Sequence, residues 1–439
     1  MAEMRQVGFW EEMCKVYHEN FRCSGMVHQS ARVRGPLTAE LIQDGLLFLQ
    51  KRHPLLQVTF SEFDEAHSAF KFDSYEKSPN KKTLIPLTVI AKHGDEHWKQ
   101  VVEEELNTDF KEGSPCLWRV TYIHDNSDEQ IHDFVFIFHH SISDGTSNAY
   151  VVRDLLSYCS GETDSLKEMP LMPPAEKLIQ SSQPSTDLDS DFVRNEDVGK
   201  MDLTNWSFEA NAPIENRRTR VIYRELPAEI VTALREKGKT KGVSMNSLMT
   251  AAFILAGLKN DHVSKNVMFS SAISLRKSCV PPVGNDHFGC YVMVVNTTHE
   301  VREDKSFWTL AAESGVALKD AIGEKEKAGF MPDVFSKKDL KMGMVEGLGA
   351  TNDAGFFPGG PVISNLGLLD FPENYGPFRL ENLYFSTSQV SGNFHTCLWV
   401  LTLHGKLFCC FTYIEPLLSS VTAEKVVDLF VSTLENLNS

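Results

Sequence analysis

The sequence DFVFIFHHSISDG, residues 133–145, decides the fold because it joins a long apolar run to a short polar turn. Its first part, DFVFIFHH, is almost continuously apolar, which is typical of a strand that is buried on both faces. Side chains alternate along a strand, so His140 lies on the same side as the phenylalanines of this run. An amphipathic helix follows the turn and ends near Gly161. We therefore predict that both histidines lie where a buried strand ends, beside a cleft.

The residues at this strand end suggest acid–base chemistry. An imidazole with an unperturbed pKa of about 6.5 suits a general base at neutral pH, and His140 is the candidate. Asp144 falls at the expected helix start, where a carboxylate caps the helix or anchors a cation. Gly145 allows a positive φ or a close backbone approach. The alternative is a structural histidine pair with an ordinary cap. We expect no metal, since adjacent histidines point to opposite faces and no third ligand follows.

The segments before this stretch alternate short strands with helices. A helix capped by Thr38 and closed by Pro54 carries one apolar face, and a second helix is predicted at 97–106. The predicted strands are 55–60, 84–91, 117–124 and 134–140. Such alternation predicts an α/β fold, a two-layer α+β sandwich in which helices cover a mixed sheet.

Residues 166–216 are rich in Pro, Ser and Asp and show no sustained periodicity, so we predict a crossover linker there. This linker would separate an N-terminal lobe, 1–165, from a C-terminal lobe, 217–439. The second lobe has a clear apolar helix capped by Ser244. Its predicted strands are 219–226, 267–273, 291–297, 395–404 and 407–413. The two lobes are thus expected to share one style of architecture.

These motifs resemble the CoA-dependent acyltransferase superfamily, whose signature HHxxxDG matches residues 139–145. The resemblance extends over most of the chain. Residues 35–60 are similar to the family's first helix and its RHP-L-L strand, with the sequence GPLTAELIQDGLLFLQKRHPLLQVTF. Residues 242–255 are similar to the helix that opens the family's second lobe. SAISLR at 271–276 resembles a strand that ends in arginine, and ISNLG at 363–367 resembles a segment near the active site.

The superfamily includes chloramphenicol acetyltransferases, plant-type acyltransferases and condensation domains of nonribosomal peptide synthetases. The plant-type DFGWG motif is absent, and the match favours the alcohol acetyltransferase and polyketide-associated branch. The resemblance implies two chloramphenicol-acetyltransferase-like lobes around a central channel. It also implies that His140 is the base in HHxxxDG and that Asp144 forms a structural ion pair with Arg276. His139, Ser364 and Asn365 are candidates for oxyanion or substrate contacts, and a plain loop role is the alternative for Ser364 and Asn365.

The implied reaction transfers an acyl group from acyl-CoA, with acetyl-CoA as the expected co-substrate, to an alcohol or, less favoured, an amine. No acyl-enzyme and no permanently bound cofactor are expected. A basic cluster before the capped helix is the candidate site for the CoA phosphates, although a solvated charge run is the favoured explanation of it. This cluster consists of Arg235, Lys237, Lys239, Lys241 and Ser244. A carrier-protein thioester donor and a non-catalytic ligand-binding protein remain alternatives.

Composition limits the other classes of function. The chain has 439 residues and a formal net charge of -16, which disfavours nucleic-acid binding. Its nine cysteines form no CxxC pair, and no apolar segment approaches membrane-spanning length, so we expect a cytoplasmic protein with reduced thiols. A serine hydrolase is disfavoured because GxSxG is absent. Two lobes in one chain make a monomer the expected state.

Overall fold

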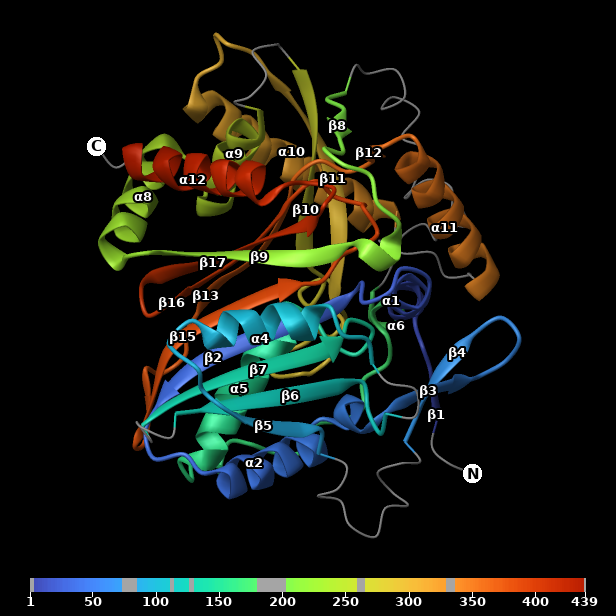
Figure 1. Cartoon of the computed structure of the whole chain (residues 1–439), viewed down its shortest axis with the longest axis vertical. Coiled ribbons are helices and arrows are strands. Elements are labelled where there is room, and N and C mark those ends of the chain that lie inside the picture. Colours follow the sequence, from blue (N-terminus) through green and yellow to red (C-terminus); the bar gives the residue numbers. More distant parts are fainter. Residues whose placement is uncertain are drawn as a thin grey trace.

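The computed structural model describes residues 4–72, 85–110, 114–125, 130–179, 203–258, 265–328 and 336–437, and its two main sheets have six strands each. Figure 1 shows one sheet above the other along the longest axis, with helices covering both. The predicted strand 84–91 begins at Leu87 in the structure, and Leu84 lies outside the described residues.

The first sheet is built around β7 (Ile131–His139), whose phenylalanines are fully buried. All its strand pairs are antiparallel except β5 (Leu87–Ala91) with β6 (Trp118–His124). In spatial order its strands are β14 (Asn374–Tyr375), β15 (Phe378–Thr387), β2 (Met26–Arg34), β7 (Ile131–His139), β6 (Trp118–His124) and β5 (Leu87–Ala91). The helices α2 (Ala39–Arg52) and α5 (Gly145–Cys159) pack together against it, and α4 (His97–Leu106) contacts both β7 and the second sheet.

The second sheet mixes parallel and antiparallel pairs, because β13 (Val362–Leu369) runs parallel to both of its neighbours. Its strands, in spatial order, are β11 (Val292–Val301), β10 (Lys265–Ser274), β13 (Val362–Leu369), β16 (Cys397–Leu403), β17 (Lys406–Glu415) and β9 (Arg218–Leu226). The apolar helix α9 (Met245–Leu258) packs against α10 (Phe307–Ala328) and α12 (Ser420–Asn436) and is almost completely buried. The helices here are α8 (Ala228–Lys241), α9 (Met245–Leu258), α10 (Phe307–Ala328) and α12 (Ser420–Asn436).

One strand pair ties the two halves of the sequence together. β14 and β15 lie in the second half of the chain, yet β15 pairs with β2 and completes the first sheet. β15 also contacts β16 and β17 of the second sheet. The lobe ranges 1–165 and 217–439 stay a prediction, and the chain crosses between the two sheets within the second range.

Short elements form two small sheets beside the main ones. β1 (Met4–Gln6), β4 (Ser68–Lys71) and β3 (Thr59–Glu62) form a small sheet, and β12 (Phe356–Phe357) pairs with β8 (Trp206–Ser207). The helix α1 (Phe9–Asn20) packs against α11 (Lys337–Asp353). The remaining short helices are η1 (Pro54–Gln57), α6 (Ala175–Leu178) and η4 (Ile214–Asn216). Part of the predicted linker, 180–202, lies outside the described residues.

Local signals explain most helix boundaries. Thr38 caps α2 by accepting from the N–H of Leu41 at 3.2 Å, and Ser244 Oγ accepts from Ser247 N–H at 3.1 Å at the start of α9. The predicted strand 55–60 is wrong at its start, because Pro54 opens the 3-10 helix η1 and β3 begins only at Thr59. Within the described ranges no single helix is long and apolar enough to cross a membrane; only α8 and α9 together reach that threshold, and they are bent by 100°.

Candidate active site

The two histidines lie at the end of β7, where the chain turns into α5. His139 is the last residue of the strand and pairs with Met26 of β2. The N–H of His140 donates to the carbonyl of Gly25 at 2.9 Å, and the N–H of Ile142 donates to the carbonyl of His139 at 3.0 Å. A fully hydrogen-bonded strand end therefore fixes the backbone that carries the His140 ring.

The ring of His140 has a defined tautomer. Its Nδ1–H donates to the carbonyl of Ser143 at 2.8 Å, inside the same turn. Since a carbonyl only accepts, the proton of a neutral ring sits on Nδ1 and the lone pair sits on Nε2. The sulfur of Cys290 lies 3.7 Å from Nδ1 on the same side. A partly exposed imidazole with a free lone pair on Nε2 is the form that a general base requires.

The surroundings of His140 also affect its basicity. Burial disfavours a charged imidazole, but Cys290 and the carbonyl of Ser143 favour it, and they raise the pKa of His140 to about 9. The full rise needs an ionised Cys290. Burial keeps this thiol protonated at neutral pH because it raises the pKa of Cys290 well above its usual value. The ring is thus a stronger base than free imidazole.

Asp144 does not contact the ring of His140 but is fully engaged elsewhere. Its carboxylate caps α5 by accepting from the N–H of Ser147 at 2.7 Å. It also accepts from Arg276 Nη2, which lies 3.1 Å from Oδ1 and 3.0 Å from Oδ2, and from the N–H of Tyr291 at 3.0 Å. Both charged side chains are buried. This saturated carboxylate has the environment of a structural anchor.

Arg276 joins the ion pair to the loop between β10 and β11. Its Nη1 donates to the carbonyls of Gly284 at 2.8 Å and His287 at 2.9 Å, and its Nη2 donates to Ser147 Oγ at 2.7 Å. The guanidinium carbon also lies 4.6 Å from the centroid of the Tyr291 ring. Through these contacts, the turn after β7 in the first sheet is fixed to a loop of the second sheet.

Gly145 lies where both sheets approach the turn. A Cβ at this position would lie 2.9 Å from the ring of Phe385 on β15 and 3.0 Å from Leu366 on β13. Both distances are too short for a side chain without movement of the neighbours. The glycine is needed here for close packing.

His139 points into the core of the first sheet. Its exposed fraction is 2%, and its Nδ1 accepts from Ser141 N–H at 3.2 Å and contacts Ser141 Oγ at 2.8 Å. The ring packs edge-on against Phe60 and His18. Burial lowers the pKa of His139 well below its usual value, so the ring is neutral. This enclosed position gives His139 a packing role, and the predicted substrate contact stays a prediction.

The segment ISNLG lies on β13, beside the turn that carries His140. Leu366 is the residue that approaches Gly145. Asn365 Nδ2 donates to Asn246 Oδ1 at 3.2 Å, and Asn365 Oδ1 accepts from the N–H of Gly367 at 2.8 Å. Ser364 is buried in the ladder between β10 and β16. The structure therefore brings this segment to the site, while its role as an oxyanion donor stays a prediction.

The predicted phosphate-binding cluster lies at the C-terminal half of α8. Lys237 Nζ donates to the carbonyl of Leu437, and Lys241 Nζ lies 5.7 Å from the centroid of the Trp308 ring. Cations near a helix C-terminus complement the helix dipole, which explains this position without a ligand. The cluster members on this helix are Arg235, Lys237, Lys239 and Lys241. Their binding of CoA phosphates stays a prediction.

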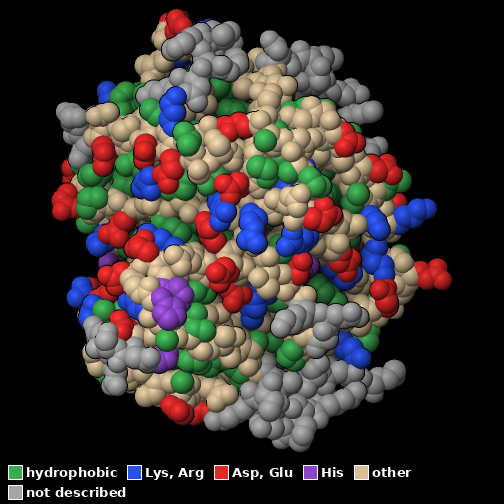
Figure 2. Space-filling model, viewed as in Figure 1, with side chains coloured by type: hydrophobic (Ala, Val, Ile, Leu, Met, Phe, Trp, Pro, Cys, Tyr) green, Lys and Arg blue, Asp and Glu red, His purple; other side chains and the backbone are tan. Residues whose placement is uncertain are grey.

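Basic side chains on the face drawn in Figure 2 gather across its middle, mixed with acidic ones. On β9, which crosses this level in Figure 1, Arg220 pairs with Glu103 at 2.9 Å and with Glu415 at 2.7 Å. Arg224 pairs with carboxylates of α12. These arginines are neutralised by their own neighbours, so they do not form an anion site.

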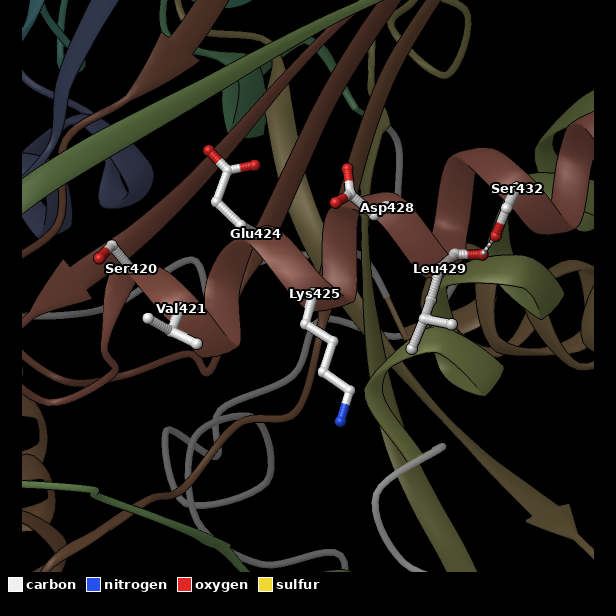
Figure 3. A pocket seen from close by; sticks show the side chains of 7 residues that line it. All are labelled: Ser420, Val421, Glu424, Lys425, Asp428, Leu429 and Ser432. Atoms are coloured by element: carbon white, nitrogen blue, oxygen red, sulfur yellow. Dashed lines mark hydrogen bonds between the residues drawn. The ribbon is translucent and has the colours of Figure 1, made fainter.

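A shallow depression runs along the outer side of α12 and is shown in Figure 3. It is lined by Ser420, Val421, Glu424, Lys425, Asp428, Leu429 and Ser432. Its two carboxylates both contact Arg224 Nη2, at 2.6 and 2.8 Å. None of the residues that surround His140 lines this depression, so we do not assign it to the candidate active site.

Several residues of this site carry no signal that sequence reasoning can read. Cys14, Cys290, Tyr291 and Phe385 come from elements far from residues 139–145 in the chain and match no motif, so only the fold brings them beside the turn. Ser147 and Leu366 lie within or next to stretches that the sequence singled out, but their contacts could not be predicted from it.

Comparison with known proteins adds family-level information. A family model described as alcohol acetyltransferase matches residues 91–434. Bassianolide nonribosomal cyclodepsipeptide synthetase of Beauveria bassiana is 32% identical over 127 residues, which cover 29% of this chain and 4% of the synthetase. PF 1022-synthetase of Rosellinia sp. is 31% identical over 133 residues, which cover 30% of this chain and 4% of that synthetase. The chain thus matches only a small part of the length of these synthetases.

Solved structures share the fold over almost the whole chain. Trichothecene 15-O-acetyltransferase TRI3 from Fusarium sporotrichioides has a TM-score of 0.73 at 14% identity, covering 98% of this chain and 94% of that one. Polyketide synthase associated protein 5 from Mycobacterium tuberculosis has a TM-score of 0.66 at 15% identity, and the match covers 99% of this chain and 98% of that one. The first condensation domain of the CDA synthetase has a TM-score of 0.69 at 12% identity, and the match covers 99% of this chain and 96% of that one.

Proposed function

Because this chain belongs to the alcohol acetyltransferase family, we propose that it transfers an acyl group from acyl-CoA to the hydroxyl of an alcohol, with His140 as the general base. The observation that carries this proposal is the hydrogen bond from His140 Nδ1–H to the carbonyl of Ser143 at 2.8 Å. It leaves the lone pair on Nε2, where it can accept the proton of an acceptor hydroxyl.

The proposed reaction proceeds by direct attack. Nε2 of His140 takes the hydroxyl proton while the acceptor oxygen forms a bond to the thioester carbonyl carbon. The tetrahedral intermediate then collapses, the carbon–sulfur bond breaks, and the imidazolium returns its proton to the leaving thiolate. The products are an ester and the free thiol, and no acyl-enzyme forms. Ser364 and Asn365 are the proposed donors to the oxyanion, a role worth about 3 kcal/mol in other enzymes.

Asp144 and Arg276 support the base without taking part in proton transfer. Their ion pair fixes the turn that contains the Ser143 carbonyl, and this carbonyl holds the His140 tautomer. Because the carboxylate already accepts from Ser147, Arg276 and Tyr291, it has no free direction toward the ring of His140. We propose that loss of the ion pair would reduce catalysis through disorder of the turn.

We propose acetyl-CoA as the donor, with the α8 cations receiving its phosphates, and an alcohol in preference to an amine as the acceptor. A carrier-protein thioester is a second candidate donor, and a specific observation favours it. The sequence relatives include a nonribosomal cyclodepsipeptide synthetase, and a condensation domain shares the fold over 99% of this chain. The bond chemistry at His140 would be the same with either donor.

Thiol release distinguishes the donors. The full chain would be incubated with acetyl- to palmitoyl-CoA and a pooled alcohol and amine library, and in parallel with the same acyl groups on a phosphopantetheinyl carrier protein. Acceptor-dependent release from a CoA ester supports the proposed donor and ranks chain lengths. Release from the carrier protein alone supports the second candidate. No release from either donor by the folded protein would contradict both and favour a non-catalytic role.

A further inference from the structure

Three side chains of types that can ligate a metal meet beside the turn after β7. Cys14 comes from α1, His140 from the turn, and Cys290 from the loop before β11, and their ligand atoms all lie within 4.8 Å of one another. We propose that they form a binding site for a thiophilic divalent cation such as Zn²⁺, and that its binding switches off acyl transfer. The second part of this proposal rests on the proposed role of His140.

The distances in the cluster are close to those of a tetrahedral zinc site. With Zn–S of 2.3 Å and Zn–N of 2.1 Å, ligand atoms around one ion lie about 3.6 to 3.8 Å apart. Cys290 Sγ and His140 Nδ1 are already separated by 3.7 Å. Since the largest separation in the group is within 4.8 Å, a contraction of about 1 Å completes the site. The fourth position remains for water or an acceptor oxygen.

The donor set also selects the type of metal. Two thiolates and an imidazole are soft or borderline ligands, which favour Zn²⁺ over Mg²⁺ or Ca²⁺. Cys14 and Cys290 are both buried, with exposed fractions of 6% and 4%. A buried charge must be compensated, and two thiolates neutralise a divalent cation. Metal binding would therefore displace one proton from each thiol and leave a site without net charge.

Coordination would remove the catalytic lone pair. The nitrogen next to Cys290 is Nδ1, which now donates to the carbonyl of Ser143. To bind the metal, Nδ1 must lose its proton, and a neutral ring then carries its proton on Nε2. Nε2–H cannot accept a proton from an acceptor hydroxyl. The metal would thus inhibit by changing the tautomer of His140, in addition to blocking its surroundings.

Sequence spacing gave the opposite expectation, that the chain has no metal site. The three ligands are separated by more than a hundred residues each, so no short metal motif exists. They meet only because α1 packs next to the segment that leads into β11, as the shared core of Phe9, Met13 and Tyr291 shows.

Cobalt spectroscopy tests binding without reference to activity. The full reduced chain would be titrated with Co²⁺, and we expect a thiolate-to-cobalt charge-transfer band that saturates at one equivalent and is bleached by Zn²⁺. Cys14→Ser and Cys290→Ser should each weaken binding at least tenfold. Cys159→Ser, which removes a partly exposed cysteine of α5 outside the cluster, should bind like the wild type. Thermal unfolding of each apo variant would verify that it is folded.

The absence of a thiolate band in the folded wild type, or equal binding by Cys14→Ser, would overturn the metal site. Inhibition is measured separately, with the ester product followed by mass spectrometry because free CoA thiols bind zinc themselves. Zn²⁺ but not Mg²⁺ should suppress product formation, and a chelator should restore it. The Cys14→Ser protein should be inhibited less by Zn²⁺ than the wild type, when the rate of each protein is compared with its own rate without metal. If product forms but zinc leaves it unchanged, the proposed function stands and the switch fails. If no product ever forms, the cobalt result alone decides the metal site.

Discussion

Arg276 Nη2 lies 3.0 Å from Asp144 Oδ2 although the two residues are 132 positions apart in the sequence. The exposed fractions of the two residues are 2% and 4%, so this is a buried ion pair. It connects the start of α5, which packs on the first sheet, to the loop that follows β10 of the second sheet. The position of the turn that carries His140 therefore depends on contacts between the two halves of the molecule.

Removal of one member of this pair should destabilise the protein strongly. Asp144→Ala leaves Arg276 charged, buried and without its carboxylate, which typically costs about 3–5 kcal/mol. Urea unfolding would measure the loss in free energy of unfolding. The control is Glu381→Ala, which removes the partner of Arg34 in a more exposed pair and should cost less than about 1 kcal/mol. Similar small effects of both substitutions would contradict a structural role for Asp144.

Gly145→Ala should reduce both stability and turnover. The added methyl would meet Phe385 and Leu366 at 2.9 and 3.0 Å, and such overpacking costs about 1–3 kcal/mol. Gly349→Ala is the matched control, since a Cβ on that residue of α11 meets nothing within 4 Å and alanine favours a helix. Thermal unfolding should move in opposite directions for the two variants. Unchanged stability and turnover in Gly145→Ala would show that Gly145 is not tightly packed against Phe385 and Leu366.

The pH dependence of the reaction should report the contact between Cys290 and His140. The active form is the neutral ring, so kcat/KM should rise with pH through the pKa of His140, which the contact moves from 6.5 toward about 9. Cys290→Ala removes a group that favours the charged ring and should therefore shift the rise to lower pH. Cys159→Ala should leave the profile unchanged. A midpoint below 6.5 in the wild type, or an upward shift in Cys290→Ala, would contradict this assignment.

The α8 cations give a prediction about the donor. If Lys239 binds a CoA phosphate, Lys239→Glu should raise the KM for acetyl-CoA by about fivefold or more, which corresponds to roughly 1 kcal/mol for an exposed ion pair. The KM for the acceptor should not change. Lys425→Glu, on the outer side of α12, is a control for altered net charge. Equal KM values for all three proteins would show that the phosphates bind elsewhere.

The predicted family and the mixed α/β fold are confirmed, because both rest on local signals. The helix at 97–106 has the predicted bounds, and Thr38 caps α2 as its position before an apolar face suggests. The strand β15 was missed. It pairs with β2, more than three hundred residues away, and no local pattern shows which sheet a strand will join.

The candidate site was predictable where a compact motif exists and not where tertiary packing creates it. Residues 139–145 stand together in the sequence, after a buried strand that could be recognised from its composition. The resemblance also paired Asp144 with Arg276, and the structure shows their contact. Cys14 and Cys290 could not be found in this way, because each is a single buried cysteine among nine.

The central claim is that His140 is the general base, and the most direct test is kcat/KM of His140→Ala in the acyl-transfer assay. Loss of a general base typically lowers the rate by about 100- to 10,000-fold, and we expect a decrease in this range with normal thermal unfolding. His93→Ala, at an exposed histidine before α4, should retain wild-type activity. Acyl transfer by His140→Ala at the wild-type rate would contradict the account.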